Sequence, residues 1–357
     1  IKKFNQNLDI DSYDYSLMNF SLRFNKSSNP LDWRIYGKLE ESFSEQRSII
    51  YDSVGVGLGQ YRYDSEINSY ISDPNGKFVA YTIYTGNKIP NTVFESSQDF
   101  NIDIGFLNLF PKIVLRGNSR QKIRGDKIQF SNISNPTISN DNLSISNIYS
   151  RYEALIIGEI RLLCWIENEK KLNGLDFRGR DLLKSKKIGL EFNKNIFEYL
   201  SLENIISYKI NRNESNFDNL RKRDLSGIWN ELNFQFNSKN KANFDLIFLI
   251  GYDKGNQQNF PFYSTAIGSK VKAKAFLKQN GRFETEISYI VSKEKNNLAY
   301  IPPEALNGYP IGSSFQTNTR LQFFLNKSIS MIYSLHTINN IRYNEFISFN
   351  GEIRAYF

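Results

Sequence analysis

The C-terminal segment, residues 346–357, alternates between apolar and polar side chains up to the last residue. One phase holds only apolar or small residues: Ile347, Phe349, Gly351, Ile353, Ala355 and Phe357. The other phase is mostly polar or charged, with Ser348, Asn350, Glu352 and Arg354. A period of two predicts a β-strand with one apolar face and one polar face. The fold must therefore cover that apolar face, either with a second sheet or with lipid.

The same alternation continues upstream in pairs of segments. Short connections join the members of each pair, at residues 193–195, 237–240, 278–282 and 326–328. Longer polar stretches separate the pairs, at residues 211–224, 253–263, 292–312 and 339–344. Short and long connections thus alternate, which predicts an antiparallel meander with all its short turns at one end.

Charged residues avoid the apolar phase of these C-terminal strands. The opposite phase carries them, and we predict that it lines an interior: Glu231, Asp245, Lys272, Lys274, Lys278, Arg282, Glu284, Glu286, Arg320, His336, Glu352 and Arg354. A charge on the lipid face of a barrel costs about 2–4 kcal/mol at the bilayer midplane, whereas a polar lumen tolerates it. The predicted strands also approach the ~9–11 residues that a tilted membrane-spanning strand needs.

The terminal strand resembles the closing strand of Gram-negative outer-membrane β-barrels, which ends on an aromatic residue. The resemblance implies that the barrel-insertion machinery reads the apolar phase: Phe349, Gly351, Ile353, Ala355 and Phe357. It also implies that Phe357 ends at the periplasm, so that the long connections lie outside. We therefore predict an all-β protein, an antiparallel up-and-down transmembrane β-barrel of about 14–16 strands in the bacterial outer membrane. The barrel would span residues 1–357, with outer-membrane lipid around it.

The N-terminal third is harder to assign. Residues 52–90 predict a small β-meander inserted between wall strands, placed in the periplasm, in the lumen as a plug, or as a long wall hairpin. Residues 13–24 and 33–39 predict a hairpin, and residues 100–110, 112–115, 128–133 and 143–148 predict further strands. Residues 152–167 predict one long strand, because their four charges share a phase; a buried helix is the alternative.

Composition excludes several kinds of site. The chain has one cysteine, Cys164, and one histidine, His336, so it has no internal disulfide, no His/Cys metal cluster and no catalytic scheme that needs two histidines. Asp64, Glu66 and Asp73 lack the spacing of a calcium loop, and no phosphate-loop motif follows Gly59. The net charge of +8 is spread without a basic run, so we expect no nucleic-acid partner, no metal and no cofactor.

Three functions remain open. The first is an outer-membrane barrel that acts as a pore for small solutes, or as an anchor for extracellular loops or an upstream region. The alternative is a secreted soluble β-sandwich that acts as an adhesin-like binding module. The third is an outer-membrane hydrolase, for which only His336 with Ser330 and Ser334 in its phase is available. Nothing marks either serine as activated, so we expect a solvated histidine in the lumen and no enzyme.

Overall fold

The computed structural model shows an all-β chain. It describes residues 16–25, 30–66, 69–104, 112–126, 136–139, 143–175, 179–216, 222–238, 242–257, 260–277, 280–295, 301–302, 304–325, 328–341 and 344–355. Over these residues the chain forms a seventeen-stranded sheet and one short 3₁₀ helix, η3 (Ala305–Gly308). Within the same ranges, no helix has the length and apolar character needed to cross a membrane.

The strands of the first half are β1 (Leu17–Asn25), β2 (Leu31–Ser53), β3 (Gly59–Asp64), β4 (Ser69–Gly76), β5 (Phe78–Asp103), β6 (Lys112–Gly125), β7 (Leu143–Ile157) and β8 (Arg161–Asn173). The strands of the second half are β9 (Asp181–Phe197), β10 (Leu200–Ser215), β11 (Arg223–Ser238), β12 (Ala242–Gln257), β13 (Phe260–Phe276), β14 (Gly281–Glu294), β15 (Gly312–Phe324), β16 (Ile329–Asn340) and β17 (Asn344–Ala355).

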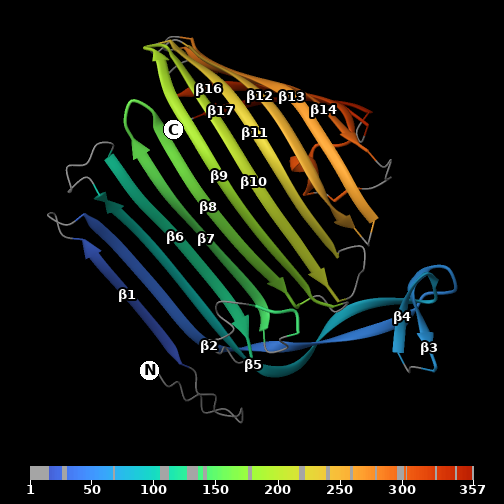
Figure 1. The fold of residues 1–357 in the computed structure, drawn as a ribbon. Helices are drawn as coiled ribbons and strands as arrows, with labels where there is room; N and C mark the ends of the chain where they lie inside the picture. Colours follow the sequence, from blue (N-terminus) through green and yellow to red (C-terminus); the bar gives the residue numbers. More distant parts are fainter. Residues whose placement is uncertain are drawn as a thin grey trace.

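Each wall strand pairs antiparallel with the next one along the chain, as the meander prediction requires. The exception is β2, which pairs with β1 and then with β5, so that β3 and β4 stand outside the wall. Figure 1 shows the sheet curling round, with its last strands lying behind the middle ones. Among the described residues, β1 pairs only with β2 and β17 only with β16, so these two strands are the edges of the sheet.

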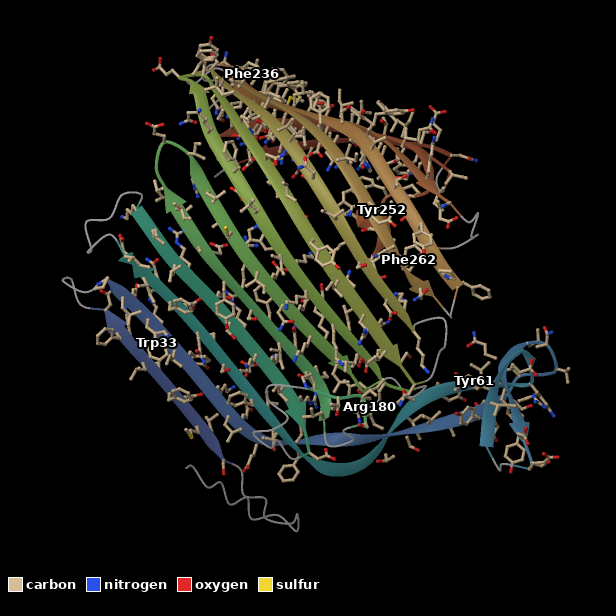
Figure 2. All side chains as sticks on the ribbon, viewed as in Figure 1. Trp33, Tyr61, Arg180, Phe236, Tyr252 and Phe262 are labelled. Atoms are coloured by element: carbon tan, nitrogen blue, oxygen red, sulfur yellow. The ribbon has the colours of Figure 1, made fainter. Side chains whose placement is uncertain are left out.

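The sheet has two chemically different faces. On one face, which we name the apolar face, large side chains such as Ile250 and Ile267 remain 57% and 61% exposed. Their neighbours Leu249 and Ala266, on the opposite or polar face, are 3% and 2% exposed. In Figure 2, Phe236 and Tyr252 lie toward opposite ends of the strands that carry them. Cross-strand register keeps each face continuous, because Ile228 pairs with Tyr252, which pairs with Thr265.

The apolar face carries charge only away from its middle. Within the described strands, Lys184, Lys186, Arg212 and Lys254 lie on this face near one end of the sheet, and Lys194 lies on it near the other end. We name the first of these the loop end, since the connection between β14 and β15 lies there. The opposite, or turn end, holds the tight hairpins β7–β8, β9–β10 and β13–β14. A belt free of charge therefore crosses the middle of the apolar face.

Two predicted connections are wrong. Residues 253–263 are not a long loop, because β12 continues to Gln257 and β13 begins at Phe260. Residues 193–195 are not a turn but belong to β9, which reaches Phe197. Strands β10 and β11 likewise extend into the stretch 211–224. Backbone pairing does not require apolar side chains, so polar residues beyond the belt extend the ladders.

The single strand predicted over residues 152–167 is two strands, and the helix alternative is also wrong. Strand β7 ends at Ile157 and β8 begins at Arg161, with the Gly158 amide donating to the Ile160 carbonyl over 3.2 Å. Ala154 pairs with Cys164 on the apolar face. The turn preserves the even-numbered phase, so the alternation in the sequence passes through it unbroken.

The shorter N-terminal predictions have mixed outcomes. Strands β1 and β2 form the predicted hairpin, with Phe20 opposite Gly37. The segments 112–115 and 143–148 are the starts of the longer strands β6 and β7. The strand predicted over residues 100–110 stops in β5 at Asp103; residues 105–110 and 128–133 lie outside the described ranges.

Residues 52–90 lie in a long projection from the wall. Strands β2 and β5 are 23 and 26 residues long, and they continue pairing from Arg47 opposite Tyr84 to Ser53 opposite Phe78. Strands β3 and β4 join this hairpin at its tip, where Tyr51 stacks on Tyr70 at 3.9 Å between ring centroids. We name residues 47–84 the arm. It leaves the sheet at the loop end, at the lower right of Figure 1, and Figure 2 labels Tyr61 within it.

Candidate functional site

The predicted interior residues lie together on the polar face. Seven of them line a hollow of about 580 Å³ formed by β12–β16: Asp245, Lys272, Lys274, Glu284, Glu286, Arg320 and His336. Glu231 and Arg282 occupy the same face of β11 and β14, and Glu352 and Arg354 that of β17. Lys278 lies outside the described residues.

The charges in this hollow neutralise one another. Lys272 faces Glu286 across β13 and β14 with 3.8 Å between charged atoms, and Lys274 faces Glu284 at 3.5 Å. Arg282 also reaches Glu284, at 3.3 Å. These side chains are between a third and half exposed, where such pairs contribute only about 0–1 kcal/mol each. The hollow is therefore a nearly neutral wall braced by cross-strand pairs.

His336 has no acidic partner among its described contacts. Its Nε2 lies 3.3 Å from the Gln316 side-chain nitrogen, and its ring packs edge-on against Phe346. A histidine that acts as the general base for a serine needs an acidic group that orients its imidazole. The Gln316 side chain is a neutral amide and does not supply that group. In the part of the chain that the structure describes, no group of three metal-binding side chains occurs.

A segment that the sequence indicated only as a polar connection folds against the polar face. We name residues 301–302 and 304–311 the inner segment. Leu306 in η3 is fully buried and packs with Trp229, Leu249, Ala266 and Ile290 on β11–β14. Ala305 packs with Leu225 and Phe262 nearer the loop end. Apolar contacts therefore hold part of the β14–β15 connection on the wall.

A buried carboxylate fixes the inner segment in place. Asp253 on β12 is completely buried; its Oδ1 accepts a hydrogen bond from Trp229 Nε1 over 3.0 Å, and its Oδ2 accepts one from the Leu306 amide. Lys209 Nζ on β10 lies 3.2 Å from Oδ2. A buried charge is stable only when it is paired and hydrogen-bonded, and here each interaction meets that need.

Lys209 extends the network to the backbone of the inner segment. Its Nζ donates to the Glu304 carbonyl oxygen over 2.9 Å and to Asn307 Oδ1 over 2.8 Å. The Glu304 side chain in turn accepts two hydrogen bonds from Arg223 on β11, over 2.9 and 2.6 Å. Leu306 and Asn307 both have positive φ, at 54° and 50°. The contacts with Asp253 and Lys209 compensate for this unfavourable backbone conformation.

Two glycines make room for the Asp253 carboxylate and the Trp229 ring. A Cβ on Gly227 would lie 1.6 Å from Asp253 Oδ1, and one on Gly251 would lie 2.5 Å from the Trp229 ring. Each glycine faces the residue that it accommodates on the neighbouring strand. The hydrogen bond between Trp229 and Asp253 therefore requires residues without a Cβ at positions 227 and 251.

The sequence prediction missed these residues for a specific reason. Asp253 was assigned to a loop, and Lys209 belongs to a strand in which no partner for it could be recognised. One signal was present: Trp229 lies in the polar phase of its strand, where a large aromatic ring has to be covered. The cover comes from Leu306, which is distant in sequence.

The predicted insertion residues lie on the last strand. Phe349, Gly351, Ile353 and Ala355 share the apolar face of β17 with Ile347, and all are exposed. Phe357 lies outside the described residues.

No family model matches the chain, and no curated protein matches it either.

Proposed function

We propose that this chain forms a transmembrane β-barrel in the bacterial outer membrane and acts as a pore for small solutes. The observation that carries the proposal is the contrast between the two faces of the sheet. The apolar face has a charge-free belt with exposed residues such as Ile250, Ile267 and Phe349, whereas the polar face holds paired charges. Exposed apolar surface of this extent is stable in lipid, not in water.

The alternative, a soluble sandwich, needs a second sheet about 10 Å from the apolar face. In the described ranges all seventeen strands belong to one sheet, and none stacks on that face. The predicted orientation places the turn end at the periplasm and the loop end outside. The inner segment would then narrow the pore from one side, because it lies on the polar face.

A second candidate function, an anchor for an extracellular element, is favoured by the arm. The arm extends beyond the wall at the loop end and carries exposed apolar side chains at Val56 and Leu58, which are 85% and 76% exposed. On this view the barrel displays the arm outside the cell. The two functions do not exclude each other.

The test combines membrane behaviour with conductance. We expect the chain to require detergent for solubility and to migrate faster on an SDS gel unheated than after boiling, as a closed barrel does. Incorporated into planar bilayers, it should give discrete channel steps in potassium chloride. A chain that is soluble without detergent contradicts the membrane proposal. A chain that inserts but shows no channel steps in several salts contradicts the pore function and leaves the function as an anchor for an extracellular element.

A further inference from the structure

Strand β6 carries a row of cations on the polar face, in addition to the charges predicted to line the interior. The row is Arg116, Arg120, Lys122 and Arg124. Lys122 pairs with Glu95 at 2.7 Å, and Arg124 donates to Asn91 over 2.8 Å. Arg116 and Arg120 are both exposed, and neither makes an ion pair with a residue in the described ranges.

A hollow of about 610 Å³ opens in front of these two arginines. It is also lined by Asp99, Asn118, Tyr149, Arg151 and Glu153. Its two carboxylates already have partners: Asp99 accepts a hydrogen bond from the Asn118 amide, and Glu153 pairs with Arg151 at 2.7 Å. We name this space the arginine hollow, because its three arginines, Arg116, Arg120 and Arg151, outnumber its two carboxylates.

The chemistry of the arginine hollow differs from that of the neutral hollow on β12–β16. A guanidinium stays charged at any physiological pH, and its planar donors match the oxygens of a carboxylate or a phosphate. Arg116 and Arg120 are four residues apart on one strand, roughly 13 Å at ~3.3 Å per residue. Long side chains on the same face can therefore approach one anion or pass it from one guanidinium to the next.

We propose that the arginine hollow binds small oxyanions, such as phosphate or a carboxylate, and makes the pore selective for anions. This inference rests on the proposed pore function and names the class of solute. Anions are concentrated at the arginine hollow, whereas the paired charges of the other hollow attract neither sign. Binding must be weak enough for release, as in other channels.

The test uses planar bilayers with a potassium chloride gradient and inorganic phosphate as the probe. We expect the reversal potential of the wild-type channel to have the sign of chloride selectivity, and phosphate to reduce the current saturably. The double variant Arg116→Gln/Arg120→Gln should lose the chloride preference and raise the half-blocking phosphate concentration about tenfold or more. The matched control is Lys274→Gln/Glu284→Gln, which removes one cation and one anion from the neutral hollow and should change neither value.

The outcomes separate this inference from the pore itself. Open channels that prefer potassium, or that phosphate blocks equally in the double variant, overturn the inference and leave the pore. If the wild type forms no channel, the pore proposal fails, and calorimetry with phosphate and the detergent-solubilised protein decides the site. Binding that the double variant loses supports the arginine hollow; no binding to the wild type overturns it.

Discussion

The Lys209 ammonium lies 3.2 Å from the Asp253 carboxylate, and the two side chains are 8% and 0% exposed. This pair joins β10 and β12 directly beneath η3, the one helical turn of the inner segment. Removing one member of a buried pair leaves the other charge uncompensated, at a cost of about 3–5 kcal/mol. The Asp253 carboxylate is therefore the charged centre of the contacts that hold the inner segment, beside its apolar packing and the Arg223–Glu304 pair.

Asp253→Asn should release the inner segment from the polar face. The amide keeps the shape of the carboxylate but cannot balance Lys209. We expect an increase in single-channel conductance and faster cleavage of the β14–β15 connection by added protease. Asp224→Asn is the matched control, because Asp224 faces Arg212 at 4.0 Å with both side chains more than half exposed. Equal conductance in wild type and Asp253→Asn would show that the inner segment does not narrow the pore.

Gly227→Ala should disrupt the contacts of Asp253 from the neighbouring strand, β11. The added Cβ would lie 1.6 Å from Asp253 Oδ1, so either the carboxylate or the strand must move. We expect a lower unfolding temperature of the detergent-solubilised protein and a conductance close to that of Asp253→Asn. In Gly351→Ala the new Cβ would meet the Tyr333 ring at 3.8 Å, an ordinary contact, so this variant should behave as wild type. A stable Gly227→Ala protein with wild-type conductance would contradict the role of Asp253 in holding the inner segment.

A charge on the apolar face tests which solvent that face meets. Ile267→Lys places an ammonium in the middle of the belt, where Ile267 is 61% exposed. In lipid this change should cost about 2–4 kcal/mol, measured as a lower urea midpoint for folding into liposomes. Asn318→Lys puts the same charge on an exposed position of the polar face and should be tolerated. If Ile267→Lys is neutral and improves solubility, the face meets water.

The arm should be dispensable for the wall. Arg47 and Tyr84 are direct cross-strand partners, so an Asn-Gly turn can replace residues 48–83 and close the hairpin. We expect the shortened protein to keep the gel shift on heating and the wild-type unit conductance. Failure of the shortened chain to fold would show that the arm stabilises the wall.

Local periodicity was enough to predict the C-terminal strands and their two faces. The alternation of Phe349, Gly351 and Ile353 predicted β17, and the short connection at residues 326–328 predicted the β15–β16 hairpin. Strand ends were predicted less well, because the alternation of apolar and polar side chains marks the belt whereas backbone pairing continues beyond it. The β7–β8 turn was missed for a related reason, since Gly158–Ile160 leaves the phase unchanged.

The contacts that join Asp253 to Lys209 and to the inner segment could not be predicted in the same way. Asp253, Lys209 and Glu304 belong to three separate parts of the chain, and only the register of β10–β12 together with the return of the β14–β15 connection brings them into contact. The charged residues of β6 were missed as well, because the predicted strand ended at residue 115, before Arg116 and Arg120.

The two edges of the sheet impose a rule on its closure. Every pairing along the wall from β1 through β2 and β5 to β17 is antiparallel, and as a result β1 and β17 both run from the loop end to the turn end. Direct contact between them would be a parallel seam, with slanted and slightly weaker hydrogen bonds. A wall in which every pair is antiparallel therefore needs an odd number of additional strands between β17 and β1, whichever polypeptide provides them.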